Sequence, residues 1–359
     1  MKIAQVAPLH ESVPPRLYGG TERVISYLTE ELVHQGHEVT LFASGDSVTR
    51  ARLRPMCDRA LRLDAKPLTD PLAHHMRLVE RVVQEAPKFD IVHFHIDYLP
   101  FSLIRRENIN AVTTLHGRLD TPDLFPLFRE FDDMRLISIS DAQRAPMPWA
   151  GWLATVPHGL PLDLHRPGSG RGGYLAFLGR ISPEKGVDRA IEIARKVRIP
   201  LRIAAKVDSS DKAYFERHIR PLLADPLVDF VGEINERDKT EFLGNAQALL
   251  FPIDWPEPFG LVMIEAMACG TPVIAFRRGA VPEVLEDGVT GLLVEDVEEA
   301  AAAAEAVALM DRRACRAEFE RRFSARRMCH DYLRAYEMAM EGSEQAVAGR
   351  NGTLLARTA

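Results

Sequence analysis

The chain has 359 residues, of which 46% are hydrophobic and 27% are charged. This balance is typical of a folded globular protein and disfavours a disordered or fibrous chain. The formal net charge of -6 lacks the basic field by which nucleic-acid-binding proteins usually hold their partner, so no nucleic acid is expected. The four cysteines form no Cys-x-x-Cys pair, which disfavours a structural zinc site and a disulfide framework.

The sequence predicts neither export nor a membrane span. The apolar stretch at residues 2–8 is much too short for a signal peptide, and nowhere do about 18 apolar residues follow one another. The scattered cysteines suit a reducing compartment. We therefore expect a cytoplasmic protein.

The first part of the chain alternates short β-branched runs with helical patterns. Residues 2–7 predict a buried strand, and apolar side chains at helical spacing predict a helix over 21–35 that ends at Gly36. Further strands are predicted at 39–43, 90–94, 111–115 and 135–139. This alternation indicates a parallel, doubly wound sheet.

Residues 157–173 have a different composition, with three prolines and five glycines, which favours an irregular connector. We therefore predict a first domain over 1–160, a second over 161–340 and a flexible tail over 341–359. Ligands of doubly wound sheets bind beyond the carboxyl ends of the strands, so the chemistry is expected in a cleft between the two domains.

The second domain repeats the pattern of the first. A strand is predicted at 174–178, followed by a loop at 179–186 and a helix at 187–197. The remaining strands are predicted at 201–205, 228–231, 248–251, 272–276 and 291–294. Further helices are predicted at 300–309 and 313–340.

The strongest functional signal is the segment 256–272. Gly260 opens a helix there and Gly270 ends it. The first-turn amides of Leu261 and Val262 have no partner within the helix, so they are suited to bind a phosphate or sugar oxygen.

Two glutamates lie on either side of that amino end. Glu257 precedes the helix, and Glu265 lies roughly 6–8 Å along it at a rise of 1.5 Å per residue. One carboxylate at each end of a phosphate-sized gap fits a sugar nucleotide, with sugar hydroxyls at Glu257 and the ribose at Glu265. The alternative is a structural motif in which Glu265 is a half-buried helix residue.

Two further loops offer ligand-binding groups. Arg180 and Lys185 follow the first strand of the second domain and suit a diphosphate, one as a planar fork and the other as a point charge. Gly19 and Gly20, where the first helix begins, let backbone approach a ligand beside the unpaired amides of that helix. The alternative for Arg180 and Lys185 is a solvated surface pair. The alternative for Gly19 and Gly20 is a plain tight turn.

Three histidines, His93, His95 and His116, end predicted strands of the first domain. No carboxylate stands at ligand spacing from them, and the sequence has no Asp-x-Asp motif, so no metal is expected. His116 is instead predicted to donate a hydrogen bond into the cleft. The alternative is a strand-end histidine that is satisfied within the fold.

The stretch 50–66 is locally basic, with six arginines and lysines against two aspartates. Such a run is usually a solvated face. The alternative is weak peripheral contact with an anionic membrane, at the inner membrane surface, or with an acidic acceptor.

With two glutamates separated by seven residues in a Pro-Phe-Gly context, residues 1–340 resemble the retaining glycosyltransferases of family 4. Members of that family have the GT-B fold, in which two Rossmann-like doubly wound domains face each other across a cleft. The resemblance implies that Glu257 contacts the donor hexose and Glu265 the ribose hydroxyls. It also implies that Arg180 and Lys185 hold the diphosphate and neutralise the leaving group.

The same resemblance implies the other contacts. His116 would face the reacting sugar, Ile234 would border the base, and the last helix would cross back onto the first domain from about Arg327. The donor site would be completed by residues of two loops: Gly19, Gly20, Phe259, Gly260, Leu261 and Val262. The chain departs from the family at His158, where asparagine is common, and at Glu233, where a basic residue is common.

The implied reaction moves a hexosyl group from a nucleoside-diphosphate sugar to a hydroxyl acceptor, with retention of the anomeric configuration and without a metal or other cofactor. Frequency within the family favours UDP-glucose as the donor. The acceptor, a small molecule, a glycan or a lipid-linked sugar, is not identified by the sequence. Three alternatives stay open: a sugar-nucleotide 2-epimerase, a sugar phosphorylase, and a non-catalytic module that binds a nucleotide sugar.

Overall fold

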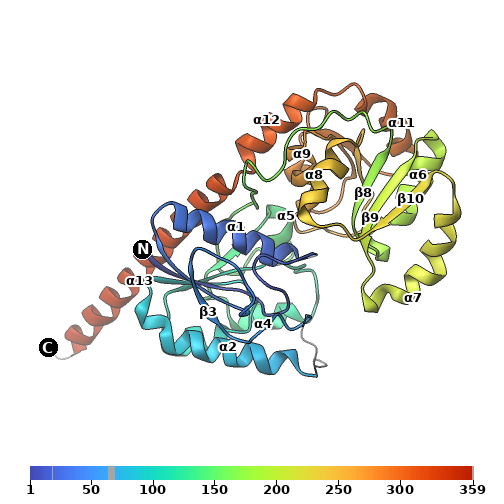
Figure 1. Cartoon of the computed structure of the whole chain (residues 1–359). Coiled ribbons are helices and arrows are strands. Elements are labelled where there is room, and N and C mark those ends of the chain that lie inside the picture. Colours follow the sequence, from blue (N-terminus) through green and yellow to red (C-terminus); the bar gives the residue numbers. More distant parts are fainter. Residues whose placement is uncertain (18, 64–68, 358–359) are drawn as a thin grey trace. The chain divides into compact units, whose positions relative to one another are not determined.

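The computed structural model describes residues 1–17, 19–63 and 69–357, with side chains up to residue 342. These residues form two compact α/β units, each built on its own parallel sheet (Figure 1). The first unit comprises Met1–Ile139, Arg144–Pro157 and Ala325–Ala359, and the second comprises Ser140–Gln143 and His158–Ser324. The predicted α/β class with two Rossmann-like halves is confirmed.

Seven strands of the described residues form the first sheet, all parallel and in the order β3-β2-β1-β4-β5-β6-β7. Their bounds are β1 (Lys2–Val6), β2 (Glu38–Ala43), β3 (Arg52–Pro55), β4 (Ile91–Phe94), β5 (Ala111–Thr114), β6 (Leu136–Ser138) and β7 (Trp152–Thr155). The strands predicted in this half are confirmed. The strands β3 and β7 are not among the predicted strands. Both are partly exposed edge strands, and β3 also lacks a continuous apolar run.

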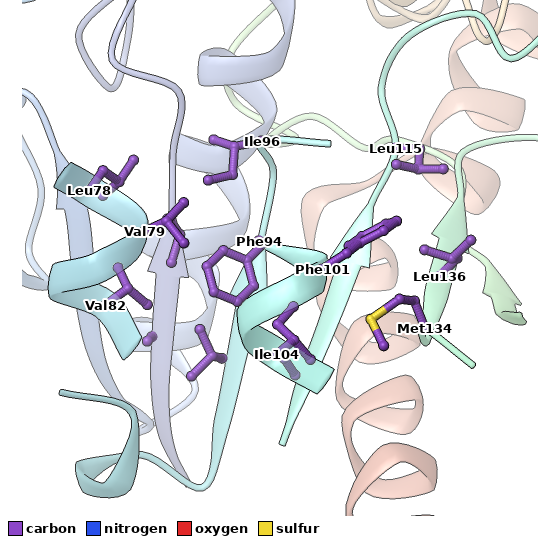
Figure 2. Packing of buried hydrophobic residues seen from close by; sticks show 14 of the residues in the cluster. Leu78, Val79, Val82, Phe94, Ile96, Phe101, Ile104, Leu115, Met134 and Leu136 are labelled. Atoms are coloured by element: carbon purple, nitrogen blue, oxygen red, sulfur yellow. The ribbon is translucent and has the colours of Figure 1, made fainter. Parts of the chain in front are cut away.

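Helices cover both faces of this sheet. Their bounds are α1 (Gly20–His34), α2 (Pro71–Glu85), α3 (Phe101–Glu107), α4 (Leu124–Glu130) and α13 (Ala325–Arg357), with a 3-10 turn η1 (Ala86–Lys88). The short helix α5 (Asp141–Arg144) belongs to the second unit except for Arg144. Figure 2 shows the apolar core on one face, where Val79 and Val82 of α2 lie beside Phe94 of β4. Helices α1 and α13 pack against each other within the same unit.

Side chains along a strand alternate between the two faces of the sheet. Val92 and Phe94 of β4 belong to the apolar core, so His93 between them points to the opposite face, where it contacts α13. Gln5 of β1 points the same way. The face of the sheet beneath α13 is therefore lined by buried polar side chains.

Tyr336 of α13 joins a buried hydrogen-bond network on that face. Its hydroxyl lies 3.0 Å from Nε2 of Gln5 and 2.7 Å from Nδ1 of His93. The other ring nitrogen of His93 lies 2.7 Å from Oγ1 of Thr114, which donates to the hydroxyl of Tyr332 at 3.2 Å. The network ties α13 to three neighbouring strands of the first unit.

The second sheet has six parallel strands among the described residues, in the order β10-β9-β8-β11-β12-β13. Their bounds are β8 (Leu175–Arg180), β9 (Leu201–Lys206), β10 (Val228–Gly232), β11 (Leu249–Phe251), β12 (Val273–Phe276) and β13 (Gly291–Val294). Every strand predicted in this half is confirmed.

The helices of the second unit are α6 (Val187–Val197), α7 (Lys212–Tyr214), α8 (Glu236–Gly244), α9 (Leu261–Ala268), α10 (Val281–Val284), α11 (Val297–Val307) and α12 (Arg312–Arg322). Short 3-10 and π turns are η2 (Pro183–Lys185), η3 (Ser209–Asp211), η4 (Phe215–Ile219) and η5 (Arg220–Ala224). Apolar side chains of α6 and α11 form one buried cluster with the strands. Helices α9 and α12 contact each other.

The continuous helix predicted over 313–340 is wrong, because the chain breaks it into α12 and α13 at Phe323 and Ser324. The carbonyl of Phe323 accepts a hydrogen bond from the amide of Leu160 at 2.8 Å, so it is withdrawn from the helical ladder. The chain leaves the second unit at this break, and α13 then runs on to Arg357.

Buried His93 is expected to make the first unit acid-sensitive. Burial holds the pKa of His93 well below its usual value, so the folded chain keeps this ring neutral where the unfolded chain takes up a proton. The free energy of unfolding should therefore fall as the pH drops below the unfolded pKa of about 6.5. The loss is at most about 1.4 kcal/mol per pH unit for each such histidine.

Urea unfolding at pH 7 and pH 5 measures this dependence. The variant His93→Gln keeps a donor and an acceptor but does not titrate, so its midpoint should fall less between the two pH values than that of the wild type. Equal falls in both proteins would show that His93 does not carry the dependence.

Candidate functional site

The order in which the chain adds strands to the second sheet reverses between β8 and β11. After β8 the chain continues to β9 on one side, whereas the strand on the other side of β8 is β11. Loops that leave two such strands diverge at their carboxyl ends, and this is where open α/β sheets bind ligands. The two loops concerned are 181–186 and 252–260.

The loops meet in a charged contact. The ammonium of Lys185 donates to Oε2 of Glu257, and the indole N–H of Trp255 donates to the same oxygen at 2.9 Å. The ammonium also lies 4.7 Å from the centre of the Trp255 ring, which allows a cation–π interaction. Glu257 is buried, so Lys185 belongs to a built contact and is not half of a solvated surface pair.

Arg180 ends β8 and has different partners. Its guanidinium donates to Glu184 at 2.6 Å, and its Nε lies 3.6 Å from a carboxylate oxygen of Asp211. Arg180 thus ends the strand, Lys185 lies on the loop that follows it, and each faces its own carboxylates. Asp211 and Trp255 belong to no motif by which they could be recognised in the sequence.

A close backbone approach holds the two loops together. Gly186 has φ of 71°, and a Cβ atom built on it would lie 2.2 Å from the carbonyl oxygen of Pro252. The amide of Asp254 donates to the carbonyl of Glu184 at 2.9 Å. Arg189 also donates to the Pro252 carbonyl, at 2.9 Å. Only glycine fits at position 186, because it combines the left-handed backbone with the missing side chain.

The predicted helix after Gly260 is confirmed as α9, and Gly260 begins it in the left-handed conformation with φ of 83°. In the part of the chain that the structure describes, no side chain caps this helix. Leu261 and Val262 are half-buried, whereas the rest of α9 is buried. The amino end of α9 therefore offers amide donors in a partial positive field.

Phe259 is buried beside that end. Its ring lies 4.8 Å from the ring of His158 and 6.0 Å from the ring of Phe323. The side chain of Phe259 therefore packs into the second unit.

Glu265 lies one turn into α9 and is 4% exposed. Its Oε1 accepts a hydrogen bond from the ammonium of Lys239, on α8, at 2.7 Å. The ammonium also lies 3.4 Å from Oε2 of Glu236, whose Oε1 is 3.2 Å from Nε2 of His165. Lys239 was not identified from the sequence, because a lysine in an ordinary helical pattern carries no motif.

This group includes three possible metal ligands. One atom each of His165, Glu236 and Glu265 lies within 4.8 Å of the others. The ammonium of Lys239 is within contact distance of both carboxylates, so it already supplies positive charge at this point.

The loop after β10 carries Ile234, which is half-buried, and Glu233, which is exposed. Asn235 follows and caps α8, its side chain accepting hydrogen bonds from the amides of Arg237 and Asp238. Ile234 thus lies between the end of β10 and the beginning of the helix that bears Lys239.

His116 belongs to the first unit and follows β5. Its Nε2 lies 2.9 Å from Nδ1 of His95, and Nε2 of His95 lies 2.9 Å from Oε1 of Gln5. Burial lowers the pKa of His116 to about 3, so the ring is neutral at physiological pH. Both ring nitrogens of His93 and both of His95 are hydrogen-bonded to side chains of this network.

Gly19 and Gly20 lie where α1 begins. A Cβ atom on Gly19 would lie 2.8 Å from Cβ of Pro15, so the packing of the loop itself requires glycine there. Tyr18, which precedes them in the chain, lies outside the described residues.

The basic stretch 50–66 is largely paired with acids. Arg50 lies 2.7 Å from Glu30, Arg54 lies 2.7 Å from Glu85, and Arg62 lies 3.4 Å from Glu11. Positions 64–68, including Lys66, lie outside the described residues. None of the helices in the described ranges has the length and apolar character needed to cross a membrane.

Comparison with protein families matches both halves of the chain. Residues 18–153 match the model of Glycosyltransferase Family 4, and residues 168–325 match the model of Glycosyl transferases group 1. The chain belongs to glycosyltransferase family 4. Its two parallel-sheet units have the GT-B fold.

Two relatives come from Mycobacterium leprae. A D-inositol 3-phosphate glycosyltransferase is 32% identical over 194 residues, which cover 49% of this chain and 43% of that relative. The match thus spans less than half the length of that relative. A phosphatidyl-myo-inositol mannosyltransferase is 27% identical over 393 residues, which cover 97% of this chain and 100% of that relative.

The structure of Anabaena HepE in complex with UDP and glucose is similar in fold. Its TM-score is 0.72 at 18% identity, with 94% of this chain and 99% of that chain covered. Similarity at this identity concerns the fold alone.

Gly186→Ala is expected to separate the two loops of the glycosyltransferase site. Alanine would be strained at this φ and would collide with the Pro252 carbonyl, so the free energy of unfolding should fall by more than about 2 kcal/mol. The affinity for a nucleoside diphosphate should fall as well. Thermal unfolding and calorimetric titration measure the two effects.

The matched control is Gly288→Ala. Gly288 has φ of 77° with nothing within 4 Å of the built Cβ, so this variant has the backbone strain without the collision. It should lose about 1 kcal/mol of stability and keep its nucleotide affinity. Equal affinities in both variants would mean that the contact of the loops is not needed for binding.

Proposed function

We propose that the protein is a retaining hexosyltransferase that moves a sugar from a nucleoside-diphosphate donor to a hydroxyl acceptor without a metal. The observation that carries the proposal is the contact of Lys185 and Glu257. It lies where the strand order reverses between β8 and β11, beside the amino end of α9, which no described side chain caps. A cation, a carboxylate and backbone amides are the three kinds of group that a diphosphate sugar requires.

In this proposal the diphosphate replaces Glu257 as the partner of Lys185. The phosphate oxygens accept from the ammonium and from the amides of Leu261 and Val262, and Arg180 adds its planar fork. Glu257, released from the cation, accepts hydrogen bonds from the hydroxyls of the donor hexose.

Departure of the diphosphate leaves positive charge on the sugar and negative charge on the leaving group. Lys185, Arg180 and the amino end of α9 stabilise that negative charge where it develops. The acceptor attacks from the side of the leaving group, which preserves the anomeric configuration. Ile234 borders the base.

The neutral ring of His116 modifies its expected role. Its Nε2 is hydrogen-bonded to Nδ1 of His95, so this nitrogen is engaged within the first unit.

UDP-glucose is the proposed donor, in line with its frequency in the family and with the UDP and glucose bound by HepE. GDP-mannose is the competing donor, since a full-length relative is a mannosyltransferase. A 2-epimerase would convert the donor in the absence of an acceptor, and a phosphorylase would require inorganic phosphate.

Calorimetric titration with UDP, GDP and ADP in EDTA tests the donor site. We expect one diphosphate to bind tightly in the chelator and to lose about 10-fold or more in affinity in Glu265→Gln, because a carboxylate–hydroxyl contact is lost. Binding of none of the three, with or without added Mg²⁺, would contradict the proposal.

Lys185→Ala and Arg180→Ala should each lower kcat/KM by about 10²- to 10³-fold, because each removes a charged contact to the leaving group. Lys196→Ala is the control, since Lys196 forms an exposed ion pair with Glu298 on the surface. Product analysis by proton NMR should show the anomeric configuration of the donor. Near wild-type turnover in both site variants, or an inverted product, would refute the mechanism.

A further inference from the structure

We infer that Lys239 is a positioning residue that makes the site select ribonucleotides, by holding the carboxylate of Glu265 in place for the ribose hydroxyls. The inference deepens the proposed function and rests on its assignment of Glu265 to the ribose. It adds a residue that no sequence motif marks.

The first step is the contact itself. Lys239 is 9% exposed and Glu265 is 4% exposed, and their hydrogen bond is 2.7 Å long. Removal of the lysine takes a buried, charge-assisted hydrogen bond away from the Glu265 carboxylate, so this carboxylate loses part of what holds it in place. Lys239 therefore maintains both the charge and the place of this carboxylate.

The second step is the restraint on the lysine. Its ammonium lies 3.4 Å from Glu236 on the same helix, and Glu236 in turn lies 3.2 Å from His165. The other ring nitrogen of His165 lies 2.9 Å from Oγ1 of Thr240. A lysine held between two carboxylates has little conformational freedom. Its ammonium therefore fixes the orientation of the Glu265 carboxylate that is bonded to it.

The third step is the direction of Glu265. Helical side chains lean toward the amino end of their helix, so the carboxylate leans toward the first turn of α9. That turn is the proposed site of the diphosphate, and in a nucleotide the ribose is joined directly to the diphosphate. Lys239 thus acts on the ribose through Glu265 and needs no contact with the nucleotide.

The test measures the affinity for UDP and for 2′,3′-dideoxy-UDP, or for the same pair of whichever base binds. Wild type should prefer the ribonucleotide by about 10- to 100-fold, the range for hydrogen bonds to a charged group. In Lys239→Met this ratio should fall to about 3 or less. The affinity for pyrophosphate, which has no ribose, should stay within about 3-fold of the wild-type value.

Three further variants separate positioning from general stability. Lys239→Arg keeps the charge and should recover much of the ratio. Lys239→Gln keeps a donor without the charge and should show a low ratio, as Lys239→Met does. Lys196→Met breaks a surface lysine–glutamate pair and should keep the wild-type ratio. Thermal unfolding accompanies each titration.

A wild-type ratio retained in Lys239→Met would overturn the inference while leaving the donor site in place. Failure of both Lys239→Met and Lys239→Gln to fold would make the lysine a structural residue and would also overturn it. A wild-type protein that binds both nucleotides equally would refute the assignment of Glu265 to the ribose. Failure of wild type to bind any of the three diphosphates would refute the proposed function itself.

Discussion

The close contact between the loops after β8 and β11 is the constraint on which the candidate site of the second unit depends. The two strands are neighbours in the sheet but lie about seventy residues apart in the chain, so only the sheet brings Lys185 to Glu257. Glycine at 186 lets the backbones touch, and Asp254 then fixes the register of one loop against the other. The amino end of α9 follows directly from the second of these loops, and its position is set by the same contact.

Each cation of the candidate site already has a carboxylate partner in the folded chain. Lys185, which is expected to bind the ligand, is paired with Glu257, and Lys239, which positions Glu265, is paired with that carboxylate. Arg180 is likewise held by acids on its own side of the sheet. Binding of an anionic ligand at Lys185 is therefore an exchange of one anion for another, so affinity depends on the difference between two charged contacts.

The parts of the structure that the sequence predicts are those with a strong local signal. Central strands have unbroken apolar runs, and α6 and α9 have glycines at their amino ends. The edge strand β3 and the break at Phe323 lack such signals. The break depends on a backbone hydrogen bond to Leu160, which is far away in the chain. The site residues followed the same rule, since Glu257 and Glu265 lie in a local motif.

Lys239 lies in no local motif, because its role depends on the packing of α8 beside α9. Trp255 and Asp211 were missed for the same reason. His116 was correctly placed at the end of a strand, yet the direction of its hydrogen bond could not be predicted, since it depends on His95 and Gln5 from two other strands. Tertiary contacts between side chains are the information that one sequence without its fold does not supply.

The position of α13 has a consequence for synthesis of the chain. Gln5 of the first strand is hydrogen-bonded to Tyr336, 331 residues later. The ribosome must therefore complete the whole second unit before the first sheet receives the helix that covers its polar face. Domains generally fold as they emerge from the ribosome, so in this chain the second unit can reach its final structure before the first. The amino-terminal half must wait, with Gln5 and His93 uncovered, until α13 has been added.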